Sequence, residues 1–124
     1  MFAACTADFD KIIVKQDGTW NVAKSTTESY TNGVLDSTEV TENDGTITFK
    51  DDMTGSYVDS DGTTGNFTWA FNEELETITI TEDSFPLTFD ILESSNNAQT
   101  LQTEIAFEFF GVEIKTVNTI ELER

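Results

Sequence analysis

The chain has 124 residues, enough for one domain with a single core, and its 24 acidic residues against 6 basic ones give a formal charge of -18. A field of this sign repels phosphate backbones and anionic headgroups, which argues against nucleic acid as a partner. The sequence has no His, the usual side chain for proton transfer near neutral pH, whereas its 10 Phe and 2 Trp favour a folded, acidic, non-enzymatic domain over a disordered chain.

The first residues end in the only cysteine, Cys5, so no intramolecular disulfide can form. Phe2-Ala3-Ala4-Cys5 resembles the lipobox of bacterial lipoproteins, in which the Cys becomes the lipidated first residue after the signal peptide is removed. We therefore expect residues 1–17 to be the remnant of a signal peptide and a tether, with Cys5 as the lipid attachment site. The protein would be anchored in the bacterial cell envelope or secreted, and would touch a membrane only through that lipid. The alternative is a terminus with an incidental free Cys.

The end of this lead-in is apolar. Phe9, Ile12, Ile13 and Val14 predict either a helical turn that covers one end of the fold or an added edge strand.

Gly18-Thr19-Trp20 opens a long alternating segment that runs to Tyr30. Because side chains of a strand alternate between two faces, Trp20 and Val22 share a face with Lys24, Thr26 and Glu28. That face begins apolar and becomes polar, which in a barrel would give a sealed floor and a wetter mouth. The Asn-Gly pair at residues 32–33 then predicts a tight hairpin leading into a strand over residues 34–41.

Four short alternating segments follow between residues 47 and 80, separated by turns rich in Asp and Gly, which predicts consecutive antiparallel strands joined by hairpins. Phe67, Trp69 and Phe71 share one parity and so form a row of rings on one face. A row of this kind requires a core to pack into.

The turn Asp59-Ser60-Asp61-Gly62 places two carboxylates two positions apart, beside a Gly. This pattern can begin a calcium loop, because hard cations bind several oxygens, but the further ligand positions are missing. A solvated hairpin turn is the favoured interpretation, with Ca2+ binding as the alternative.

The last third of the chain alternates again, over residues 85–91, 101–110, 112–116 and 119–124. Leu101, Thr103, Ile105, Phe107 and Phe109 lie on one face, and no segment has the period of a long amphipathic helix. Eight or nine short strands with turns at fairly even intervals predict an all-β, antiparallel up-and-down β-barrel. A two-sheet β-sandwich is the alternative.

Two stretches carry a family resemblance. Gly18-Thr19-Trp20 resembles the Gly-x-Trp motif at the start of the first lipocalin strand, and the pattern from Phe49 to Ile80 is similar to the lipocalin-like domains of Gram-negative bacterial lipoproteins. The resemblance spans residues 18–124 and implies a barrel whose floor is closed by Trp20. In lipocalins an Arg near the last strand packs across that Trp; the only Arg here is Arg124, so Arg124 tests the resemblance. The Asp-Gly turn of the family reads Asp52-Met53 in this chain.

The sequence shows no catalytic residues. It lacks a nucleophile elbow, a phosphate-binding Gly-rich loop and a Cys/His metal set, and the carboxylate pairs Glu73-Glu74 and Asp51-Asp52 are adjacent in sequence, so they do not converge on a substrate. No cofactor or metal is expected for a reaction.

The remaining candidate is the barrel interior, lined by large side chains with polar contacts from Lys24 and Thr26 near the mouth. The predicted ligand-lining residues are Trp20, Lys24, Tyr57, Trp69, Phe89 and Phe107. In a small barrel the same rings could simply fill the core, and this alternative stays open. The predicted function is a non-enzymatic envelope or secreted domain that binds a small hydrophobic ligand. The alternative is an adhesion, structural or protein-interaction module that acts through an acidic, calcium-binding surface.

Overall fold

The computed structural model describes residues 8–124, and in that range the chain forms two short helical turns and nine strands. The helical turns are α1 (Phe9–Ile12) and the 3-10 turn η2 (Gln16–Gly18). The strands are β1 (Thr19–Thr31), β2 (Val34–Glu42), β3 (Thr46–Phe49), β4 (Thr54–Val58), β5 (Thr64–Asn72), β6 (Thr77–Glu82), β7 (Phe85–Ser94), β8 (Ala98–Phe109) and β9 (Val112–Glu123). Over residues 8–124, no helix has the length and apolar character needed to cross a membrane.

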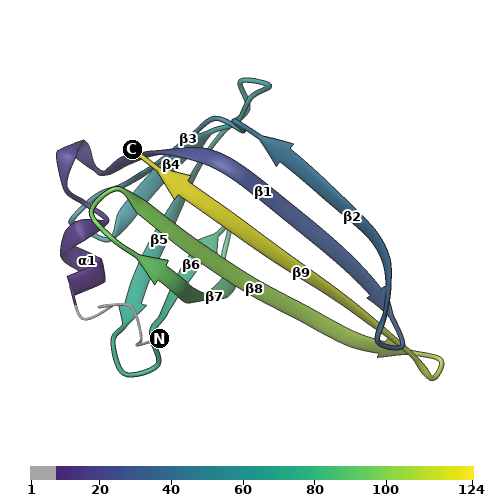
Figure 1. Cartoon of the computed structure of the whole chain (residues 1–124). Coiled ribbons are helices and arrows are strands. Elements are labelled where there is room, and N and C mark those ends of the chain that lie inside the picture. Colours follow the sequence, from purple (N-terminus) through teal and green to yellow (C-terminus); the bar gives the residue numbers. More distant parts are fainter. Residues whose placement is uncertain (1–7) are drawn as a thin grey trace.

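Eight of the strands close a barrel. Each pairs antiparallel with its neighbour in the order β1-β3-β4-β5-β6-β7-β8-β9, and β9 pairs back with β1 (Figure 1). The predicted antiparallel barrel is therefore confirmed, and the two-sheet alternative is not observed. Strand β2 is additional: it pairs with residues 24–31 of β1, whereas β3 pairs with residues 19–21 of the same strand. Since β9 occupies the other edge of β1 over residues 21–31, β2 continues the line of β3 along one edge.

Four long strands extend past the barrel as a projecting sheet, in the order β2-β1-β9-β8 (Figure 1). Strand β7 pairs only with residues 99–102 of β8, so the second half of β8 has no neighbour on that side. In this second half of β8 the side chains still alternate between two faces, but neither face borders the barrel interior. Phe107 and Phe109, on the same strand face as buried Leu101, are consequently 55% and 58% exposed.

The opposite end of the barrel is closed by the lead-in and the first strand. Phe9 and Ile13 are fully buried, and the Phe9 ring centroid lies 5.3 Å from that of Phe71. Trp20 is also fully buried, and its indole Nε1 donates a hydrogen bond to the Ile13 carbonyl at 2.9 Å. Of the two roles predicted for the lead-in, the helical turn over one barrel end is the one observed. The packed unit thus begins before Gly18; the predicted lipobox and Cys5 lie outside the described residues.

Arg124 completes this floor. Its guanidinium carbon lies 3.9 Å from the centroid of the Trp20 ring, in cation–π geometry. Its nitrogens donate hydrogen bonds to three carbonyls from two segments: that of Asn96 (2.8 Å) in the β7–β8 loop, and those of Lys15 (2.8 Å) and Ile12 (3.1 Å) in the lead-in. Burial lowers the pKa of the Arg124 guanidinium from its ordinary value, as expected for a charge partly withdrawn from water. The Arg–Trp contact implied by the resemblance is present.

The predicted row of rings forms the wall above the floor. Phe67 and Trp69 are buried, and Phe49 packs edge-on against both, at centroid distances of 5.5 and 5.8 Å. Trp69 Nε1 donates to the carbonyls of Lys50 and Thr54, which ties this wall to the β3–β4 turn. Burial of these rings removes several hundred square ångströms of apolar surface from water, on the order of 150–250 Å² for each aromatic side chain.

The β3–β4 turn keeps a glycine-like conformation without a glycine. Met53 has a φ of 69°, in the left-handed region that Gly usually occupies. Asp52 Oδ1 accepts hydrogen bonds from the Thr54 hydroxyl (2.5 Å) and the Thr54 amide (3.1 Å), and these bonds lower the pKa of the Asp52 carboxyl. Met53 thus occupies a left-handed position at the cost of local backbone strain.

Candidate functional site

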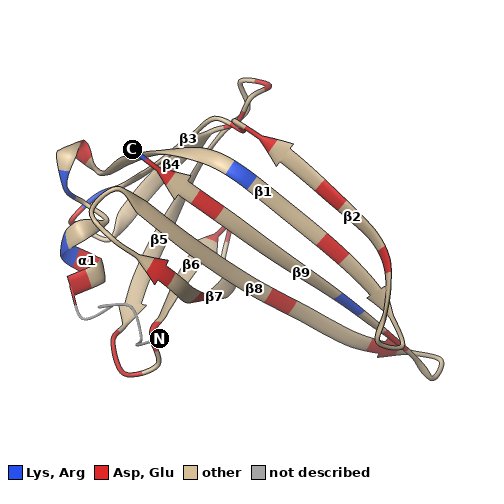
Figure 2. Ribbon diagram, viewed as in Figure 1, with Lys and Arg blue, Asp and Glu red and all other residues tan. Residues whose placement is uncertain are grey.

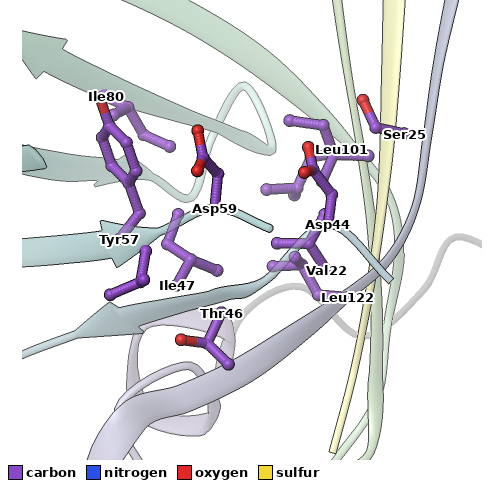
Figure 3. Close-up of a pocket in the computed structure, with 12 residues that line it drawn as sticks. Val22, Ser25, Asp44, Thr46, Ile47, Tyr57, Asp59, Ile80, Leu101 and Leu122 are labelled. Atoms are coloured by element: carbon purple, nitrogen blue, oxygen red, sulfur yellow. The ribbon is translucent and has the colours of Figure 1, made fainter. Parts of the chain in front are cut away.

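Two adjoining cavities occupy the barrel toward its open end. Their volumes are about 290 and 490 Å³, and both are bounded by Ile47, Tyr57, Ile80 and Ile120. The smaller cavity lies beside β1, β8 and β9 (Figure 3). Its remaining lining consists of Val22, Ser25, Asp44, Thr46, Val58, Asp59, Leu101 and Leu122.

The larger cavity extends toward the β6–β7 hairpin. Besides the four shared side chains it is lined by Phe67, Glu82, Asp83, Phe85, Leu87 and Phe89. Most of the lining of both cavities is aliphatic or aromatic, and the charged side chains lie just before β3, just after β4 and at the end of β6. A concave apolar space with a few polar groups is the usual form of a small-molecule site.

Tyr57 stands between the two cavities. A Cβ atom built on Gly65, its partner in the β4–β5 register, would lie 2.4 Å from the Tyr57 ring, so the ring needs a glycine beneath it. The hydroxyl donates a hydrogen bond to Glu82 Oε2 at 2.7 Å. That hydrogen bond, followed by burial and by the negative charges of Glu82, Asp59 and Asp83, raises the pKa of Tyr57 above its ordinary value near 10. The ring is therefore held in place at both ends.

A family model described as a lipocalin-like domain matches residues 17–102. The chain belongs to the lipocalin-like domain family. Its fold is similar to that of a lipocalin-like protein from Bacteroides uniformis, with a TM-score of 0.52 and 15% identity over 86% of this chain and 96% of that one. It is also similar to apocrustacyanin C1, with a TM-score of 0.51 and 15% identity over 98% of this chain and 69% of that one. At such identities the likeness shows the fold alone. Among curated proteins, none matches this sequence.

Lipocalin-like domains are in general binding proteins and not enzymes, in agreement with the lack of a catalytic pattern in the sequence. The described residues contain no group of three or more His, Cys, Asp or Glu side chains placed to hold a metal ion. Asp59 Oδ1, which was the first candidate ligand, instead accepts hydrogen bonds from the amides of Asp61 and Thr63, both at 2.9 Å. The loop is a hairpin turn closed by its own Asp, as the favoured interpretation has it, and the calcium alternative has no support in the described residues.

A β-bulge in β1 changes the predicted mouth of this lipocalin-like domain. Val22 pairs with Leu122 but Lys24 pairs with Glu121, so Ala23 is an extra residue and the alternation shifts by one position. Ser25 is thereby placed on the cavity side, opposite Ile120, and Lys24 and Thr26 face outward. The prediction that Lys24 and Thr26 give polar contacts in the cavity is wrong for this reason.

The other predicted ligand-lining residues separate into three groups. Tyr57 and Phe89 line the larger cavity, and Tyr57 also lines the smaller one. Trp20 and Trp69 are buried in the floor and wall, and neither bounds a cavity. Phe107 is six residues beyond Leu101 along β8, roughly 20 Å at the usual rise of a strand, and is exposed on the projecting sheet. Its prediction as a lining residue is not met.

Several lining residues were not singled out from the sequence. Ile80, for example, continues the inward parity of its β5 partner Trp69, so strand parity could have found it. The carboxylates at the ends of β4 and β6 look like ordinary turn residues in the sequence. Only the closure of the barrel brings them to the edge of one space.

Proposed function

We propose that this lipocalin-like domain binds a small apolar molecule in the barrel. The observation that supports the proposal is the pair of adjoining cavities, of about 290 and 490 Å³, whose shared wall is formed by Ile47, Tyr57, Ile80 and Ile120. Eight-stranded barrels either fill with side chains or hold one small ligand. The supporting feature is the space bounded by these four side chains, which the core side chains leave open.

Binding can be tested with N-phenyl-1-naphthylamine, a neutral apolar fluorophore whose emission increases in an apolar environment. Replacement of Ile80 by Trp puts a large side chain into both cavities, and we expect at least a tenfold loss of probe affinity. Ile105→Trp is the matched control, since Ile105 is 41% exposed on the projecting sheet and lies outside both linings. Wild-type binding with equal loss in both variants, or no binding by the wild-type protein, would contradict the proposal.

An interaction module remains the second candidate function, and one observation favours it. The projecting sheet and its hairpin expose large apolar side chains, with Phe110 at 90% and Phe107 at 55%. Single exposed apolar residues are normal on a protein surface, but adjoining ones such as Phe109 and Phe110, whose ring centroids lie 4.4 Å apart, are typical of interaction surfaces. A domain that acts only through this surface would show no rise in melting temperature with the apolar probe, whereas ligand binding in the barrel would raise it.

We also propose that the protein is a lipoprotein of the cell envelope. The support is the Phe2-Ala3-Ala4-Cys5 sequence, which lies outside the described residues. Mass spectrometry of the protein isolated from its native cells would show a lipid-modified Cys5, and an unmodified thiol would contradict this location.

A further inference from the structure

Every charged side chain that edges the two cavities is acidic. Asp44 and Asp59 border the smaller cavity, and Glu82 and Asp83 border the larger one. No described residue that lines either cavity is a Lys or an Arg. Figure 3 shows the carboxyl groups of Asp44 and Asp59 beside the apolar lining.

The carboxylates of both cavities contribute to the negative potential around one group, the Tyr57 hydroxyl. Glu82 accepts the hydrogen bond of Tyr57 at the boundary between the cavities. The negative charges of Asp59, from one cavity, and Asp83, from the other, also raise the pKa of Tyr57. The Tyr57 hydroxyl therefore lies in a negative potential to which both cavities contribute.

The basic residues cannot compensate at the mouth, because they lie elsewhere (Figure 2). Lys11 lies in α1 and Lys15 follows it, Lys50 follows β3 at the floor end, and Arg124 stacks on Trp20. The two remaining ones, Lys24 and Lys115, are on the outer face of the projecting sheet, where Lys115 lies 4.7 Å from the Tyr30 ring centroid.

We propose that the cavity selects apolar ligands with a cationic head group and excludes amphiphiles of the same length that carry a carboxylate. This inference rests on the proposed function. An anionic head group placed at this rim would lose hydration, meet like charges and find no cationic partner, all of which cost free energy. A cationic head group would be attracted by the four carboxylates, and its apolar tail would occupy the space between Tyr57, Ile80 and Phe89.

The test compares three probes with the same twelve-carbon chain: dodecyltrimethylammonium, dodecanol and dodecanoate. Each is titrated below its micellar concentration, in competition with N-phenyl-1-naphthylamine, at pH 7.5 in low and physiological salt. We expect the cation to bind at least tenfold more tightly than the carboxylate, with the alcohol between them. The difference should decrease as salt screens the charges.

Charge-neutral variants locate the effect. Glu82→Gln with Asp83→Asn keeps an acceptor for Tyr57 and should reduce the cation-to-carboxylate ratio at least threefold. Glu108→Gln with Glu113→Gln is the matched control, because these two carboxylates face each other in the β8–β9 register on the projecting sheet, away from both cavities. This control should leave the ratio unchanged.

The outcomes separate the inference from the proposed function. Equal binding of all three probes would overturn the charge selectivity and leave the apolar site intact. Equal loss of selectivity in both double variants would show that only net charge matters, and would overturn the local assignment. Binding of the cation that persists in Ile80→Trp would place it on the outer surface and overturn the inference as well. If no probe displaces the fluorophore and the fluorophore itself does not bind, the proposed function fails.

Discussion

Arg124 should stabilise the barrel more than any other single basic residue. Its guanidinium stacks on the fully buried Trp20 ring and donates to three carbonyls that belong to the lead-in and to the β7–β8 loop. A cation–π contact contributes about 0.5–2 kcal/mol, and a hydrogen bond from a charged donor about 1.5–3 kcal/mol when it is well buried. Because the guanidinium is partly solvated, we discount these values and expect Arg124→Ala to lower the free energy of unfolding by roughly 2–4 kcal/mol.

The assay is urea unfolding followed by circular dichroism, with the free energy taken from a two-state fit. For a chain of 124 residues, 1 kcal/mol corresponds to about 4 °C in melting temperature, so a fall of roughly 8–15 °C should accompany the change. Arg124→Lys keeps the positive charge but cannot reach three separate carbonyls, and should recover only a minor part of the loss.

Lys115→Ala provides the control for Arg124. Lys115 also lies over an aromatic ring, that of Tyr30, and pairs with Glu104 at 3.9 Å, but it does so on the solvated projecting sheet. Its replacement should cost about 0.5 kcal/mol or less. If Arg124→Ala stays within 0.5 kcal/mol of the wild type, or if Arg124→Lys matches the wild type, the contacts at the floor do not stabilise the barrel as argued.

Three further changes test individual features. Met53→Gly should raise the free energy of unfolding by about 1 kcal/mol in urea titrations, since the left-handed φ strains Met but not Gly; a loss would contradict the strained turn. Because the pKa of Tyr57 is raised, the folded protein keeps the phenolic proton at a pH at which the unfolded chain loses it. The stabilisation that the Tyr57–Glu82 hydrogen bond contributes is therefore complete below pH 10 and is lost as the pH rises further. Tyr57→Phe should therefore melt below the wild type at pH 8, with the gap closing toward pH 11; a constant gap would argue against this titration. Ser25→Phe should weaken probe binding while Thr26→Phe should not, and the reverse result would refute the bulge in β1.

Much of the fold follows from strand parity. Alternation over Phe67, Trp69 and Phe71 correctly predicted a buried wall, and the Gly-x-Trp pattern correctly placed Trp20 at the floor of a barrel. Both predictions depend on local rules, since a side chain two positions along a strand returns to the same face.

The mouth could not be predicted in this way. One extra residue at Ala23 moves every later side chain of β1 to the opposite face of the strand. The sequence around Ala23 contains no feature that marks such a bulge. The predicted contacts of Lys24 and Thr26 failed because of this single residue, and Ser25 took their place.

The sequence by itself determined the strand type and the order of the hairpins, because each depends on neighbours close in the chain. The tertiary structure alone decided how far the barrel wall extends, and therefore why Leu101 is buried while Phe107, on the same face of the same strand, is exposed. It also decided that the interior keeps open space between Tyr57 and Ile80 and that four carboxylates surround it. Strand parity tells which side chains point inward, but closure and register determine what those side chains meet.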